Sequence, residues 1–150
     1  MQYGWDRVGE TSTMLLHASA ISFQIRGLLI TGPSGSGKSS LALNLMAFGA
    51  SLVSDDQTEL VRKDDYVWAN APSALFGKIE ARGMGILAVE PAPKARIDLV
   101  VDLSKTQSER IPTDKTTNFL GIDIPTVHKS EMTAFPAALI QYLRGGKVHL

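Results

Sequence analysis

A glycine-rich octapeptide carries the most specific chemistry in the sequence. Its residues are Gly32, Pro33, Ser34, Gly35, Ser36, Gly37, Lys38 and Ser39. They fit the pattern G-x-x-x-x-G-K-[ST] at every fixed position, and such a loop wraps its backbone amides around phosphate groups. In this pattern the lysine, here Lys38, reaches the β- and γ-phosphates, and the hydroxyl, here Ser39, holds Mg²⁺. We therefore predict a binding site for a nucleoside triphosphate with Mg²⁺.

Two adjacent acids follow this loop along the chain. Asp55 and Asp56 come directly after the short apolar stretch Leu52-Val53, at the end of an expected strand. In a doubly wound sheet the carboxyl ends of the strands line the ligand crevice. A carboxylate there can bind Mg²⁺ or orient an attacking hydroxyl group. Because neighbouring strand side chains point to opposite faces, the two acids can divide these roles.

A third acid, Glu80, lies beside two glycines in the segment Ile79–Ile86. Glycines at such positions let the backbone approach a ligand closely. Glu80 could complete the ligand shell of Mg²⁺, and the alternative is an ion pair with Arg82 on the surface. The residues alone leave both interpretations open.

Apolar runs and alternation predict the elements that position these residues. We expect strands over Met14–Leu16, Ala20–Ile25, Leu28–Thr31, Leu52-Val53, Ile86–Val89, Arg96–Leu103 and Phe119–Ile124. We expect helices from Lys38 to Gly49 and over Thr133–Leu143, a turn at Arg26-Gly27, a long loop over Ser104–Asn118, and an edge hairpin of Thr58–Arg62 and Tyr66–Ala69. The pattern predicts an α/β fold: a P-loop nucleotide-binding domain with a central mixed sheet and an added β-hairpin region.

Length, charge and cysteine content limit the classes of protein to which the chain can belong. The 150 residues predict one domain over 1–150, with the polar stretch 1–12 as a loosely held lead-in. The absence of cysteine excludes disulfides, zinc ribbons and thiol catalysis. Fifteen basic and fifteen acidic residues balance, which argues against a nucleic-acid partner. No apolar run approaches the roughly 20 residues of a membrane span, and the start lacks the apolar segment of a signal peptide. We expect a cytoplasmic protein without a membrane partner.

Two segments beyond the loop resemble the catalytic domain of the HPr kinase/phosphorylase family. Leu52–Asp56 is similar to the family's strand ending in two aspartates, and Ile79–Val89 is similar to its signature segment Leu-Glu-x-Arg-Gly-x-Gly-Ile. His17 lies where the family has an active-site histidine. Arg110 falls where the family has a catalytic arginine. The resemblance extends from about His17 to Ile124.

This resemblance implies an activity, a cofactor and a partner. Members of the family use ATP and Mg²⁺ to phosphorylate a serine of HPr, a small phosphocarrier protein of the bacterial sugar phosphotransferase system. Their fold is the HPr kinase/phosphoenolpyruvate carboxykinase-like catalytic domain. The family forms hexamers, so a homo-oligomer is expected. The chain looks like a short form that consists of the C-terminal catalytic domain.

The resemblance also implies a role for each matched residue. Lys38 would neutralise the phosphates, while Ser39 and Glu80 would hold Mg²⁺. Asp56 would take the proton from the substrate serine, with Asp55 and His17 beside it. Arg110 would stabilise charge on the transferred group.

One segment departs from the family's pattern. The family has a Pro-Val-Arg-Pro-Gly-Arg-like loop before its last helices, and here Ile124–Thr133 offers only His128 and Lys129 as cations. The reverse reaction, phosphorolysis of phosphoserine, therefore stays open. Two other functions stay open too: a small P-loop kinase for a metabolite, and a nucleotide-gated binding module that transfers no phosphate.

Overall fold

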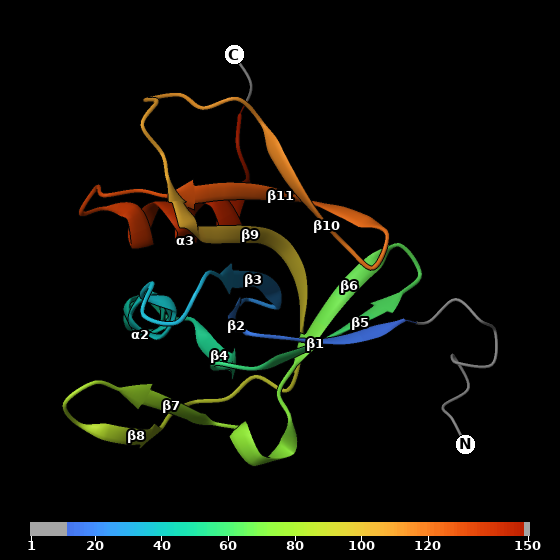
Figure 1. Cartoon of the computed structure of the whole chain (residues 1–150), viewed down its shortest axis with the longest axis vertical. Helices are drawn as coiled ribbons and strands as arrows, with labels where there is room; N and C mark the ends of the chain where they lie inside the picture. Colours follow the sequence, from blue (N-terminus) through green and yellow to red (C-terminus); the bar gives the residue numbers. More distant parts are fainter. Residues whose placement is uncertain (1–11, 149–150) are drawn as a thin grey trace.

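The computed structural model describes residues 12–148, so the lead-in predicted over 1–12 lies outside the described residues apart from Ser12. Within this range nine strands form one sheet (Figure 1). They are β1 (Thr13–Leu16), β2 (Ala18–Phe23), β3 (Arg26–Thr31), β4 (Ser51–Ser54), β5 (Thr58–Lys63), β6 (Tyr66–Asn70), β9 (Ala95–Thr106), β10 (Lys115–Phe119) and β11 (Ile122–Lys129). A separate hairpin pairs β7 (Lys78–Ala81) with β8 (Gly85–Ala88). The helices are α2 (Lys38–Ala47) and α3 (Phe135–Gly145), with a 3₁₀ turn over Ser73–Leu75.

The large sheet is mixed, as the sequence predicted. Its order is β1-β5-β6-β9-β3-β2-β4, and β11 pairs with both β9 and β10. β9 runs parallel to β3 and to β11, while the other pairs are antiparallel. β4 is parallel to β3 in direction, because β2 lies between them and is antiparallel to both. The carboxyl ends of β3, β4, β9 and β11 therefore meet at one edge of the sheet.

Apolar side chains cover both faces of this sheet. On one face α2 and α3 contribute Leu45 and Leu143, which pack with buried side chains of β2, β3 and β9. On the other face the curled sheet encloses a second core, which includes Leu29, Leu60 and Val100. Figure 1 shows the two helices on one side of the sheet and the β7–β8 hairpin as a separate arm near β4. The two cores fix β3 between them, which holds the loop that follows it.

The turn between β2 and β3 lies two residues earlier in the chain than predicted. Gln24 and Ile25 make it, with φ angles of 52° and 65°, which is typical of a tight hairpin of two left-handed residues. The prediction of Arg26-Gly27 was wrong because both residues belong to β3. Gly27 is needed for packing: a Cβ there would lie 2.6 Å from the Arg96 carbonyl oxygen of β9.

The hairpin of β5 and β6 is confirmed, but its predicted place at the edge is wrong. β1 pairs with β5 and β9 pairs with β6, so both strands lie inside the sheet. These are pairings between segments distant in the chain. A local pattern of residues carries no sign of them.

The predicted loop over Ser104–Asn118 is shorter than expected, because strands occupy both of its ends. β9 continues to Thr106 and β10 begins at Lys115, which leaves only residues 107–114 as a loop. The predicted strand Phe119–Ile124 is interrupted by a hairpin turn at left-handed Leu120 and Gly121, so Phe119 ends β10 and Ile122 begins β11. Pro125 lies within β11, where pairing with β9 begins only at Thr126. A proline is tolerated at that point because its strand still has only one neighbour.

The two α-helices match the predicted ones within two residues at each end. Among the described residues, no helix is long and apolar enough to span a membrane.

Candidate active site

The glycine-rich loop joins the end of β3 to the start of α2, as its motif requires. Gly32 has a φ of 144°, and a Cβ there would lie 2.7 Å from the Ser36 hydroxyl. Gly37 precedes the helix with a φ of 104°. The Lys38 side chain is buried and folds back over the loop, where its ammonium donates to the carbonyls of Gly32 at 2.9 Å and Pro33 at 3.1 Å. The cation is thus held inside the loop, ready to meet an anion that enters it.

Asp55 links the loop to the neighbouring strand ends. It is 6% exposed, and its Oδ1 accepts hydrogen bonds from the hydroxyls of Ser39 at 2.7 Å and Ser19 at 2.8 Å. Its Oδ2 accepts from the backbone N–H of Glu80 at 3.2 Å. Buried carboxylates are costly unless they are hydrogen-bonded, and these three donors meet that need.

Asp56 points the other way and is exposed. Its φ is 72°, a left-handed conformation that aspartate tolerates better than most residues. Its Oδ1 lies 2.8 Å from Nε2 of His17, and both side chains reach solvent. Its backbone N–H donates to the Ser19 hydroxyl at 3.2 Å. The two adjacent acids therefore differ in burial: one faces the loop and the other is open to a partner.

The sheet topology explains why these segments meet. The start of β2 lies beside the ends of β3 and β4, because β2 is antiparallel to both. The register pairs Ala18 with Thr31 and Ala20 with Ser54. His17 directly precedes β2, the loop directly follows β3, and the acid pair directly follows β4. Three segments distant in the chain thus reach one edge of the sheet.

Ser19 belongs to this site and was missed from the sequence. It is fully buried, and its hydroxyl bridges the Asp55 carboxylate and the Asp56 N–H. Its position near the start of β2, two residues after His17, was the available signal, because the start of this strand lies beside the end of β3 and the loop.

The structure places Glu80 near the loop and does not pair it with Arg82. Its backbone N–H contacts Asp55, while its side chain is exposed on β7. No ion pair joins Glu80 to Arg82 within residues 12–148. Arg82 lies past the end of β7, in the turn toward β8. The alternative of a surface ion pair with Arg82 is therefore not observed among these residues, and the contact of Glu80 with Asp55 is made by its backbone.

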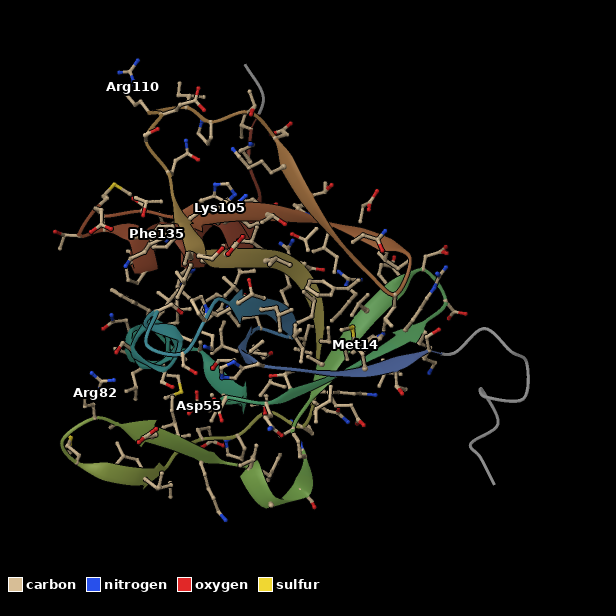
Figure 2. All side chains as sticks on the ribbon, in the orientation of Figure 1. Met14, Asp55, Arg82, Lys105, Arg110 and Phe135 are labelled. Carbon is tan, nitrogen blue, oxygen red and sulfur yellow. The ribbon has the colours of Figure 1, made fainter. Side chains whose placement is uncertain are left out.

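Arg110 is not near the acids in this conformation. It is exposed in the loop of residues 107–114, and Figure 2 shows it at the far end of that loop, away from Asp55. This loop starts from β9, whose carboxyl end is at the same edge as the glycine-rich loop. Arg110 can therefore meet the site only through a movement of residues 107–114.

The donor set suits a small, hard cation such as Mg²⁺. Mg²⁺ usually keeps several waters and takes one or two protein oxygens together with substrate phosphates. The Ser39 hydroxyl and the Asp55 carboxylate provide two such oxygens, 2.7 Å apart, beside the loop. Within the described part of the chain, no cluster of three or more His, Cys, Asp or Glu side chains forms a metal cage. The residues therefore fit a metal that arrives with a phosphate.

Comparison with known proteins decides the family. The family model described as the HPr serine kinase C-terminal domain matches residues 10–133. The chain belongs to this family. That confirms the family predicted from Leu52–Asp56 and Ile79–Val89.

This member of the HPr kinase family is also similar in sequence to individual curated proteins. It is 34% identical over 124 residues to a protein of Burkholderia lata named HPr kinase/phosphorylase, an alignment that covers 75% of this chain and 38% of the relative. The same-named protein of Burkholderia cenocepacia is 33% identical over 124 residues, with the same coverage. The chain thus spans little more than a third of the length of these relatives.

A solved structure extends the likeness to the fold. The structure titled Hpr(Ser) kinase/phosphatase from Coxiella burnetii superposes with a TM-score of 0.73 at 26% sequence identity. The match covers 87% of this chain and 94% of that chain. The predicted fold class, an α/β domain with a central mixed sheet and an added hairpin, is confirmed.

Proposed function

We propose that this chain binds ATP with Mg²⁺ and transfers the γ-phosphoryl group to a serine hydroxyl of HPr. The observation that carries this proposal is the exposed Asp56 carboxylate, 2.8 Å from His17 and next to a buried aspartate that contacts the glycine-rich loop. The family membership and the names of the relatives support HPr as the acceptor.

The loop and the residues beside it bind the phosphates and Mg²⁺ in the proposed complex. Lys38 leaves the carbonyls of Gly32 and Pro33 and neutralises the β- and γ-phosphates, which offer it stronger, charged acceptors. Ser39, Asp55 and Glu80 provide oxygens for Mg²⁺. Mg²⁺ held there would neutralise the charge that develops on the phosphates during transfer.

The transfer half assigns Asp56 as the base. The serine oxygen of HPr forms a bond to the γ-phosphorus while the bond from that phosphorus to the β-phosphate oxygen breaks, which releases ADP. The serine proton passes to the Asp56 carboxylate, which His17 orients. Ser19 and Asp55 position this carboxylate by fixing the backbone around it. Most of the rate enhancement in such reactions comes from positioning and charge neutralisation.

In the proposed reaction, Arg110 reaches the site only after the substrates have bound. The loop of residues 107–114 would close over the site and bring its guanidinium to the transferred phosphoryl group. In the reverse reaction, an oxygen of inorganic phosphate would form a bond to the phosphorus of phosphoserine while the bond from that phosphorus to the serine oxygen breaks. Pyrophosphate would leave, and Asp56 would return the proton to the serine oxygen. We propose that reverse activity as a second capacity of the same site.

The proposed setting follows from the substrates. HPr and ATP are cytoplasmic, so the chain would act in the cytoplasm, and residues 1–150 would act as one catalytic domain. We further propose that it assembles as a homo-oligomer.

A phosphotransfer assay tests the proposed function. The purified chain is incubated with Mg²⁺, γ-labelled ATP and HPr, and the labelled residue is mapped; a parallel set of reactions offers small hydroxylated metabolites. We expect label on one serine of HPr and none on the metabolites. Label on a metabolite instead would identify a small-molecule kinase. ATP binding without transfer to any acceptor would identify a nucleotide-gated module, and either result would contradict the proposal.

A further inference from the structure

Arg110, in the loop of residues 107–114, has no partner among the described residues in this conformation. Its guanidinium makes no hydrogen bond or ion pair within residues 12–148, and Figure 2 shows its side chain pointing away from the sheet. A loop that closes over the site loses conformational entropy, so a contact on the closed side must offset that loss. We therefore searched the carboxyl edge of the sheet for a group that can hold this arginine.

Asp102 of β9 lies at this edge, beside the start of the glycine-rich loop. The register of the sheet pairs it with Thr31, the residue directly before Gly32. The next residue, Leu103, is so close to the loop that a Cβ on Gly32 would lie 3.2 Å from the Leu103 Cβ. Asp102 is therefore one strand spacing, roughly 5 Å, from the strand that carries the loop.

The Asp102 side chain lies on the face of the sheet that the two helices do not cover. Val101 and Leu103 pack with the helices, whereas Val100 belongs to the core on the other face. Because strand side chains alternate between the two faces, Asp102 shares the face of Val100. Ser39 is on the opposite side, in the first turn of α2. A cation bound to Asp102 would therefore approach the phosphates from the side opposite the proposed Mg²⁺ oxygens.

Asp102 has an oxygen that is free to accept from a guanidinium. Its Oδ1 accepts from the Ser104 N–H at 2.9 Å and from the Ser104 hydroxyl at 2.6 Å, while its Oδ2 accepts no hydrogen bond from a described residue. The other two aspartates of the site suit an arginine less well. Asp55 is buried and already has three donors. Asp56 is paired with His17, and a guanidinium bound to it would compete with the serine proton that it must accept.

The length of the chain allows Arg110 to reach Asp102. β9 continues for four residues past Asp102 to Thr106, and Arg110 follows four residues later. The Gln107 N–H donates to the Lys129 carbonyl at 2.8 Å, which fixes the start of the loop on β11. At about 3.3 Å per residue, a loop that folds back from this point brings Arg110 level with Asp102.

We propose that Asp102 is a positioning residue, which binds the Arg110 guanidinium when the loop closes and holds it against the transferred phosphoryl group. Arginine and carboxylate form strong, charge-assisted hydrogen bonds of defined geometry, so this contact would fix the direction of the guanidinium. The inference rests on the proposed function, because it needs Arg110 to act in the transfer. It adds the group that selects the closed loop.

A double-mutant cycle tests the coupling of the two residues. Asp102→Asn removes the charge and keeps an oxygen that can accept from Ser104, so the end of β9 should be preserved. It is combined with Arg110→Ala. The single-turnover rate constant for phosphorylation of HPr and the Kd for ATP are measured for the wild-type chain, both single variants and the double variant.

We expect Asp102→Asn to slow transfer roughly tenfold when Arg110 is present, the cost of one charge-assisted contact. Together with Arg110→Ala it should slow transfer further by less than about twofold, because the partner is already gone. The Kd for ATP should stay unchanged throughout. Asp123→Asn is the matched control, since Asp123 is an exposed aspartate near the start of β11, at the opposite edge of the sheet. It should change neither quantity.

A second measurement follows the loop itself. An arginine-specific protease cleaves after Arg110, and the rate of this cleavage reports the fraction of molecules in which the loop is open. The full chain is digested with Mg²⁺, a non-hydrolysable ATP analogue and HPr. Cleavage after Arg110 should be several-fold slower in the wild type and in Asp123→Asn than in Asp102→Asn.

The other outcomes overturn the inference. They are an unchanged transfer rate in Asp102→Asn, an equal slowing by Asp102→Asn with and without Arg110, or equal cleavage after Arg110 in all variants. A tenfold rise of the Kd for ATP in Asp102→Asn would also overturn it, since Asp102 would then act on nucleotide binding. If the wild-type chain phosphorylated no HPr, the proposed function would be wrong and the inference would fall with it. Phosphorylation of HPr without coupling between the two residues would overturn the inference alone.

Discussion

The Ser39 hydroxyl donates a hydrogen bond of 2.7 Å to Oδ1 of Asp55. This contact joins the first turn of α2 to the end of β4, two elements that lie on either side of the bound phosphates in the proposed complex. Both oxygens belong to the class that Mg²⁺ prefers. The hydrogen bond therefore marks the place where a metal ion would insert as the nucleotide binds.

Removal of the Ser39 hydroxyl should weaken the binding of Mg²⁺ and leave the binding of ATP by the loop nearly unchanged. In Ser39→Ala the Mg²⁺ concentration for half-maximal transfer should rise by roughly tenfold, because one ligand oxygen is lost. The loop amides and Lys38 remain, so metal-free ATP should bind within about twofold of the wild type. A Mg²⁺ titration of the transfer rate measures the first effect and a binding titration the second. An unchanged Mg²⁺ dependence would remove Ser39 from the metal site.

Ser19 should act as a positioning residue. In Ser19→Ala the buried Asp55 loses a donor, so the free energy of unfolding should fall by about 1–3 kcal/mol. The rate constant for transfer should fall while the Kd for ATP stays unchanged, because Asp56 is held less well. Denaturant unfolding and single-turnover transfer measure these quantities.

Ser22→Ala is the matched control for Ser19. Ser22 is buried in the same strand, and its hydroxyl makes no hydrogen bond to another described residue. It should show the smaller loss of stability and no change in transfer. Equal effects of the two substitutions would contradict the proposed role of Ser19.

Arg110 should matter for transfer and not for nucleotide affinity. Arg110→Ala should lower the transfer rate by roughly 10²–10³-fold, the usual cost of losing one group that stabilises transition-state charge. Lys105→Ala, a neighbouring exposed cation at the end of β9, should change the rate little. Steady-state kinetics with HPr measures both. Equal rates for Arg110→Ala and the wild type would mean that the arginine stays where Figure 2 shows it, away from the site.

The elements around the site could be predicted because each is encoded locally. β3 and β4 contain short apolar runs and are followed directly by a glycine and an acid, and α2 starts within a motif of fixed spacing. β10 could not be predicted, because the polar run Lys115–Asn118 becomes a strand only through its pairing with β11. The positions of β5 and β6 inside the sheet likewise depend on β1 and β9, which are distant in the chain.

The residues of the site divide in the same way. The loop and the acid pair follow from motif and position, and the topology brings His17 beside them. Ser19 escaped notice because a serine inside a strand has no motif, and its role exists only once β4 lies next to β2. Arg110 came from a resemblance alone, and its loop carries no contact that fixes it at the site.

The most direct test of the central claim separates nucleotide binding from transfer in Asp56→Asn. Asp64→Asn is the matched control, since Asp64 is also an exposed aspartate with a left-handed backbone, at a φ of 57°. Asparagine tolerates that conformation, so neither substitution should disturb the fold. ATP affinity and phosphorylation of HPr are measured on the same samples.

We predict that Asp56→Asn binds ATP with the wild-type affinity and transfers phosphate to HPr roughly 10²–10⁴-fold more slowly, while Asp64→Asn matches the wild type in both. Loss of ATP binding in Asp56→Asn would show that this carboxylate holds the metal and is not the base. Undiminished transfer would contradict the account outright.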